Sequence, residues 1–121
     1  MLSNTTFPRS RRLLKRLDFM RVLKSGKRVS DSQLSFAILA NDQGHARLGL
    51  AIAKRGVPHA VDRNAIKRQV REAFRLHSDL PAVDIVALTR RSTQVDDLKK
   101  IRNSADTLFG RIIQHQRRVS T

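Results

Sequence analysis

The chain has no cysteine, no tryptophan and no tyrosine among its 121 residues. Without cysteine it can form neither a disulfide nor a thiolate metal site, and we expect a location in the reducing cytoplasm. No apolar run reaches the roughly 18 residues of a membrane-spanning helix. The basic N-terminal residues are not followed by the apolar stretch of a secretory signal. Binding to a membrane surface, which usually needs aromatic anchors, is not expected either.

Acidic side chains are scarce: ten Asp and Glu stand against 25 Lys and Arg, giving a formal charge of +15 and a pI near 11.8. Such an excess of positive charge indicates a polyanionic partner, most often a nucleic acid. Residues 1–30 contain nine basic and one acidic residue, and residues 54–75 contain seven basic and two acidic residues. The nearly neutral segment between these blocks has the alternating pattern of strands.

Few side chains are arranged for catalysis. The carboxylates are not clustered as a metal-dependent nuclease requires, and we expect Asp96-Asp97 to cap a helix. The histidines lack metal-ligand spacing, and no P-loop, GxGxxG, nucleophile elbow or zinc-finger pattern occurs. A two-histidine ribonuclease pair such as His59 and His77 is the one catalytic alternative. The residues therefore favour a nucleic-acid binder without chemistry of its own.

The most informative segment is the predicted helix over residues 61–77. Basic residues recur on one side of this helix at intervals of four, and Arg68 widens the ridge. The ridge consists of Arg63, Lys67, Arg71 and Arg75. The opposite side carries a stripe suited to burial, namely Ile66, Val70, Ala73, Phe74 and His77. Because like charges at this spacing repel each other, the ridge predicts a polyanion bound along it.

The remaining pattern predicts one domain over residues 1–121, with residues 1–12 and 116–121 flexible. A short helix is expected over residues 17–24, with Asp18 as its N-cap and Gly26 just past its end. Strands over 34–40 and 47–54 flank the turn signal of residues 41–44 and are expected to form a hairpin. A third strand over 84–89 and a long helix over 96–117 complete the chain.

The two faces of the expected hairpin differ in side-chain size. One face is large and apolar, with Leu34, Phe36, Ile38, Leu48, Leu50 and Ile52. The other is small, with Ser35, Ala37, Gly49, Ala51 and Ala53. Small residues allow a close approach to the sheet, either by the short N-terminal helix or by an extended ligand in a groove. Both interpretations are compatible if the helix forms one wall of the groove.

RNA is a better candidate than DNA for the polyanion. A helix-turn-helix motif needs a helix shortly before its recognition helix, whereas strands precede the basic helix here. Domains that combine strands with basic helices commonly bind RNA through its shape and phosphates.

The stretch AVDRNAIKRQVR at residues 60–71 resembles the signature of the bacterial ribonuclease P protein component. Three flanking segments are also similar to that family, in unbroken order: Leu17-Asp18-Phe19, the strand from Arg47 to Arg55, and the segment from Asp84 to Arg91. The resemblance implies an α+β fold, a two-layer α/β sandwich. A mixed sheet of roughly four strands would carry about three helices, with a left-handed βαβ crossover where right-handed ones are the default.

The resemblance also implies a function. The chain would be the non-catalytic protein subunit of ribonuclease P, an endonuclease that removes the 5′ leader from precursor tRNA. The catalytic RNA subunit would carry the hydrolysis with Mg²⁺, and the protein alone would bind no cofactor. Its partners would be that RNA and precursor tRNA, with no membrane and no small-molecule cofactor.

Site residues follow from the same resemblance. Those that match the RNA-facing motif are Arg63, Asn64, Lys67, Arg68 and Arg71. Those that match the leader-binding groove are Phe19, Lys54, Arg55 and Arg90. Alternatively, Asn64 serves the start of the helix and Phe19 belongs to the core. Ala65, Leu23 and Ala37 depart from the family pattern, so leader contact would depend more on charge than on stacking.

Two other functions compete with the resemblance. A basic ribosomal or RNA-chaperone protein would bind RNA without an enzyme partner. A protein-only nuclease would cut RNA by itself and lose activity when His59 or His77 is replaced.

Overall fold

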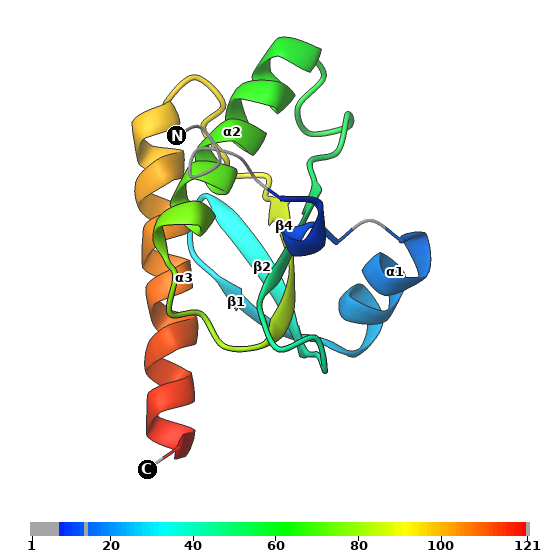
Figure 1. Ribbon diagram of the computed structural model, residues 1–121. Coiled ribbons are helices and arrows are strands. Elements are labelled where there is room, and N and C mark those ends of the chain that lie inside the picture. Colours follow the sequence, from blue (N-terminus) through cyan, green and yellow to red (C-terminus); the bar gives the residue numbers. More distant parts are fainter. Residues whose placement is uncertain (1–7, 14, 121) are drawn as a thin grey trace.

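The computed structural model describes residues 8–13 and 15–120, with side chains as far as Gln116 (Figure 1). Its elements are the 3₁₀ turn η2 (Arg9–Arg11), helix α1 (Arg16–Ser25), strands β1 (Lys27–Ser30), β2 (Leu34–Ala40) and β3 (Arg47–Ala51), helix α2 (Ala60–Leu76), strand β4 (Val83–Thr89) and helix α3 (Leu98–Ser120). The predicted α+β class is confirmed, with a mixed four-stranded sheet and three α-helices.

The strand order in the sheet is β1-β2-β4-β3. β2 pairs antiparallel with both β1 and β4, and β3 pairs parallel with β4. The hairpin predicted over residues 34–54 is therefore wrong, because β4 lies between its two strands. Asp84, Ile85, Val86 and Ala87 are all buried, so β4 needs neighbours on both sides. The strand that forms a hairpin with β2 is β1, a strand that the sequence did not predict.

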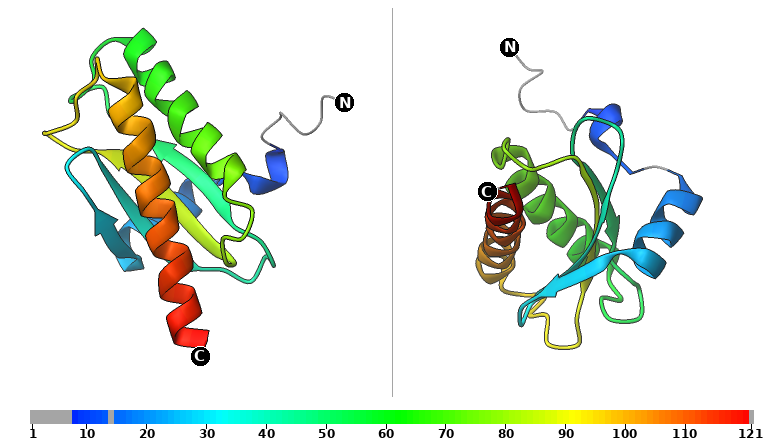
Figure 2. Two further views of the ribbon diagram at one scale, coloured as in Figure 1. Left: turned by 90° about the vertical axis from the view of Figure 1, so that its left-hand side faces the viewer. Right: turned by 90° about the horizontal axis from the view of Figure 1, so that it is seen from below.

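Helices cover the sheet unequally. α2 and α3 lie on one face and α1 on the other, as the view from below shows (Figure 2). The large face of the strands packs under α2 and α3, where the ring of Phe109 lies 4.8 Å from that of Phe36 and 5.8 Å from that of Phe74. The small face carries Ala37 and Val86, which pack with Val22 of α1. The predicted division into a large and a small face is confirmed.

α2 joins the parallel strands β3 and β4, so the three elements form the predicted βαβ unit. The four buried residues of α2 are the predicted stripe of Ile66, Val70, Ala73 and Phe74. The left hand of the crossover stays a prediction of the resemblance. Within the described residues, no helix is both long enough and apolar enough to cross a membrane, and the cytoplasmic location stays a prediction.

Element ends differ in detail from the sequence predictions. α1 begins after Lys15, so Asp18 lies in its first turn and is not the N-cap. Gly26 follows α1 as predicted, and an added Cβ there would lie 2.5 Å from the carbonyl oxygen of Val22. Asp97 caps α3 as predicted, since its Oδ1 accepts the backbone N–H of Lys100 at 3.0 Å.

The described part of the N-terminal segment contacts the sheet and α2. Arg11 donates from Nε to the carbonyl of Ala46 at 2.7 Å, and its guanidinium lies 5.1 Å from the centre of the Phe74 ring. Arg12 forms a bridge with Leu48 at the edge of the sheet. The flexibility predicted for residues 1–12 and 116–121 stays a prediction, and residues 1–7 lie outside the described part of the chain. At the other end α3 continues to Ser120, and Thr121 is not described.

Candidate nucleic-acid interface

The predicted RNA-facing residues lie along one side of α2. Asn64 and Arg68 are exposed, whereas Arg63, Lys67 and Arg71 are half-buried. Arg63 bends back over the loop before the helix, and its Nη1 donates to the carbonyls of Val57 and Pro58, both at 2.8 Å. Arg63 thus anchors the start of α2 as well as carrying charge, a role that its helical spacing could not reveal.

The rest of this surface presents its charge to solvent. His59 is the N-cap residue of α2, so Asn64 does not cap the helix. Among the described residues, Lys67, Arg68 and Arg71 form no ion pair.

Only the last basic residue of the ridge has an acidic partner. Arg75 contacts Glu72 at 2.8 Å, and this hydrogen bond lowers the pKa of the Glu72 carboxyl. Within the part of the chain that the structure describes, the ridge residues without an acidic partner therefore run from Arg63 to Arg71.

Phe19 lies on the small face of the sheet. An ideal Cβ on Gly49 would lie 2.5 Å from Cζ of Phe19 and 2.8 Å from its Cε1, so the ring rests directly on the glycine. Phe19 packs beside the small cluster of Leu13, Val22, Ala37 and Val86, yet it is only half-buried. This placement fits both predicted roles, as a wall of the groove and as part of the core.

The remaining groove residues follow the carboxyl ends of two neighbouring strands. β3 and β4 are parallel, with Ala51 opposite Leu88, so Lys54 and Arg55 after β3 lie at the same edge as Arg90 after β4. All three are exposed. The start of α2 follows at this edge as well (Figure 1). Three of the predicted groove residues thus lie at the end of the molecule where α2 begins.

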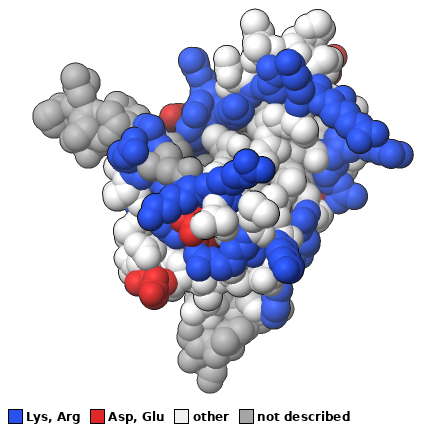
Figure 3. All heavy atoms as spheres, turned by 90° about the vertical axis from the view of Figure 1, so that its right-hand side faces the viewer, with Lys and Arg blue, Asp and Glu red and all other residues white. Residues whose placement is uncertain are grey.

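A hollow of about 500 Å³ opens on the small face beside Arg90. Arginines and hydroxyl groups line it: Arg28, Ser30, Ser35, Leu88, Thr89, Arg90, Arg91 and Ser92. Arg28 and Arg91 were not among the predicted site residues. Arg28 had no sequence signal except its charge, and Arg91 was noted only as the end of a segment similar to the family. Lys and Arg side chains cover much of this side of the molecule, with few acidic groups between them (Figure 3).

A buried ion pair holds the small face together. Arg47 donates from Nε to Asp84 Oδ1 at 2.8 Å and from Nη2 to Asp84 Oδ2 at 2.7 Å. Asn41 donates to the same Oδ1 at 2.8 Å, and Asp18 of α1 lies 4.0 Å from Arg47 Nη2. The hydrogen bonds to Asp84 raise the pKa of the Arg47 guanidinium above its usual value. This network joins β3 and β4 to the loop after β2 and to α1, at the end of the strands opposite Lys54, Arg55 and Arg90.

A family model described as Ribonuclease P matches residues 7–113. The chain belongs to the ribonuclease P protein family. The Ribonuclease P protein component of Marinobacter nauticus is 45% identical over 109 residues, which cover 88% of this chain and 82% of that protein.

Solved structures of ribonuclease P proteins agree with this assignment. The one from Staphylococcus aureus has a TM-score of 0.73 and 32% identity, covering 88% of this chain and 94% of its own. The one from Thermotoga maritima has a TM-score of 0.71 and 26% identity, covering 85% and 96%. Membership makes this chain the protein component of a ribonuclease and implies an RNA partner.

The geometry of α2 weighs against the two-histidine alternative. His59 and His77 flank the 17 residues of α2, a length of about 25 Å, so they cannot reach one phosphate together. His77 also contacts the Ala73 carbonyl through Nδ1 at 2.7 Å and packs against Phe109. Among the described residues, no group of three or more His, Asp or Glu side chains could hold a metal ion.

Proposed function

We propose that this chain is the subunit that holds the catalytic RNA of ribonuclease P against the 5′ leader of precursor tRNA. The surface of α2 from Arg63 to Arg71 binds the catalytic RNA, and the groove beside Phe19 binds the leader. The observation that carries the proposal is the position of Lys54, Arg55 and Arg90 at the carboxyl ends of β3 and β4, where α2 also begins. One protein surface can then contact two RNA molecules at once.

In this proposal the protein contributes affinity and the RNA contributes chemistry. The exposed guanidinium of Arg68 and the cations beside it neutralise phosphates and release counterions, a term that weakens steeply with salt. Lys54, Arg55 and Arg90 attract the leader backbone, while half-buried Phe19 offers the exposed part of its ring to a base or ribose. Hydrolysis of the phosphodiester, with its Mg²⁺, belongs to the assembled ribonucleoprotein.

Binding of the chain to a catalytic RNA of ribonuclease P tests the proposal. Arg68→Ala should weaken this binding and reduce the slope of log affinity against log salt by about one. Lys24→Ala is the matched control, since Lys24 is exposed in the last turn of α1, on the opposite face of the sheet from α2. Equal effects of the two substitutions would show that α2 does not face the RNA.

A further inference from the structure

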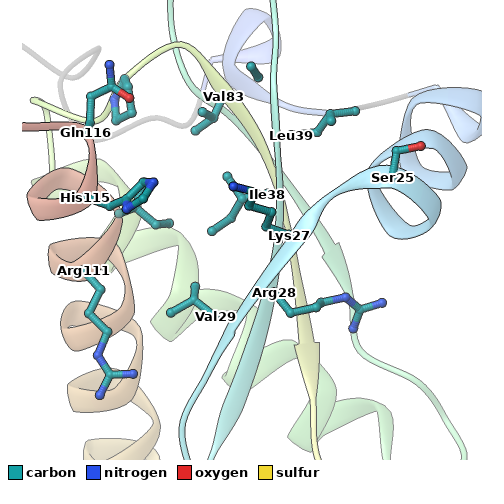
Figure 4. A pocket seen from close by; sticks show the side chains of 13 residues that line it. Ser25, Lys27, Arg28, Val29, Ile38, Leu39, Val83, Arg111, His115 and Gln116 are labelled. Atoms are coloured by element: carbon teal, nitrogen blue, oxygen red, sulfur yellow. The ribbon is translucent and has the colours of Figure 1, made fainter. Parts of the chain in front are cut away.

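A second hollow lies on the opposite face of the sheet from the groove. It has a volume of about 540 Å³ and opens between the C-terminal half of α3 and the edge of the sheet at β1 and β2 (Figure 4). None of the residues proposed to contact the catalytic RNA or the leader lines it. Its size is that of pockets which hold small ligands.

The floor of this hollow is apolar. Val29 of β1, Ile38 of β2 and Val83 of β4 border it and are only partly buried, although they pack against the main core. Ile112 of α3 closes the floor from the helix side. α3 therefore leaves one end of the large face accessible to solvent, and a flat apolar group could cover it.

The rim of the hollow is cationic and polar. Lys27 lies beside Ile38 in the β1–β2 pairing, and its side chain forms no hydrogen bond or ion pair with the part of the chain that the structure describes. His115 points from α3 towards the strands (Figure 4). Arg111 borders the hollow and donates to the Ser30 carbonyl at 3.2 Å. No carboxylate lines the hollow, so it favours an anion over a cation.

We infer that this hollow binds one unpaired nucleotide of an RNA partner. The base covers the apolar floor against the ring of His115, and the phosphate lies at Lys27. An apolar floor with a few polar groups at its rim fits a nucleobase, and the cation beside it fits a phosphate.

The edge strand β1 argues for RNA as the source of this nucleotide. Arg28 lines both this hollow and the arginine-rich hollow beside Arg90 on the other face. A strand of RNA that crosses the β1 edge would therefore meet cations on both faces. The inferred contact is additional to the two surfaces of the proposed function and does not depend on either of them.

Methyl NMR of the full chain with a single-stranded oligouridine of six nucleotides tests this inference. The methyl signals of Val29, Ile38 and Val83 should shift on addition of the oligonucleotide. Lys27→Ala should weaken this binding several-fold and lower its salt slope by about one. Lys24→Ala, which removes an exposed cation of α1 outside the hollow, should leave the methyl shifts unchanged.

Two further arms make the test decisive. Val29→Trp should fill the hollow and abolish the shifts at Ile38 and Val83, with circular dichroism confirming the fold. Uridine monophosphate alone should bind far more weakly than the oligonucleotide. Unshifted methyl signals, equal effects of Lys27→Ala and Lys24→Ala, or equal binding of the mononucleotide would each overturn the inference. These readouts are independent of precursor tRNA cleavage, so failure here would leave the proposed function standing.

Discussion

Arg47 and Asp84 form a two-pronged ion pair between the parallel strands β3 and β4, with N–O distances of 2.8 and 2.7 Å. The Asp84 side chain is 1% exposed and that of Arg47 16%. Both lie on the small face of the sheet, and Asp18 of α1 is 4.0 Å from Arg47. The pair thus sets the position of α1, and with it Phe19, over the sheet.

Removing Asp84 should leave a mostly buried guanidinium without its partner. Breaking such a pair costs about 3–5 kcal/mol, so we expect Asp84→Ala to lower the free energy of unfolding by that order in urea denaturation. The double substitution Arg47→Met with Asp84→Leu should recover much of the loss, because no uncompensated charge remains. A loss below about 1 kcal/mol for Asp84→Ala would contradict the structural role of the pair.

Two glycines provide a matched pair of substitutions. Gly49→Ala places a methyl group 2.5 Å from Cζ of Phe19, so the ring must move and the protein should lose stability. Gly110→Ala meets no atom within 4 Å inside α3, and it should stabilise the protein by about 0.5–1 kcal/mol through helix propensity. Thermal unfolding measures both, and a neutral Gly49→Ala would show that Phe19 does not rest on the glycine.

Replacing Phe19 should separate its two possible roles. If the ring contacts the leader, Phe19→Ala weakens binding of precursor tRNA to the assembled ribonucleoprotein but leaves binding of mature tRNA nearly unchanged. Loss of a stacked base is worth about 1–3 kcal/mol, roughly fivefold or more in affinity. Val22→Ala is the control, since Val22 is fully buried in the same cluster. Equal losses for both tRNAs would assign Phe19 to the core.

Acid should weaken the junction between the β1–β2 turn and α3. Burial opposes ionisation of Asp31, but hydrogen bonds from Ser104 and from the backbone N–H groups of Gln33 and Leu34, with the charge of Arg111, lower its pKa below the ordinary 3.8. A lowered pKa gives stability that is complete above the ordinary value and is lost as pH falls through the folded-state value.

Asp31→Asn tests this pH dependence. The variant should be less stable at neutral pH and should lose less stability than the natural chain between about pH 4 and pH 2. Urea denaturation at a series of pH values measures the difference. Parallel pH profiles for the two proteins would contradict a native carboxylate at this position.

The sequence predicted what depends on local periodicity. The extents of α1, α2 and β4 agree within two residues, because apolar spacing and breakers such as Gly26 act locally. The faces of the strands also followed from alternation. The pairing of β2 with β4 could not be predicted, because no local feature of the sequence distinguishes it from a hairpin between β2 and β3.

The candidate site shows the same limit. Helical spacing placed Lys67 and Arg68 on one side of the helix, but it could not show that Arg63 binds two backbone carbonyls of its own loop. The Arg47–Asp84 pair joins residues 37 positions apart, which no pattern in one sequence connects. The motif at residues 60–71 predicted more site residues than helical spacing did, because it resembles the signature of a known family.

Cleavage of a precursor tRNA at low magnesium concentration tests the central claim most directly. The reaction is run with this protein alone, with a catalytic RNA of bacterial ribonuclease P alone, and with both together. We expect efficient cleavage at the mature 5′ end only in the mixture, weakened by Arg68→Ala and unchanged by Lys24→Ala. Cleavage by the protein alone, or no stimulation of the RNA by the protein, would contradict it.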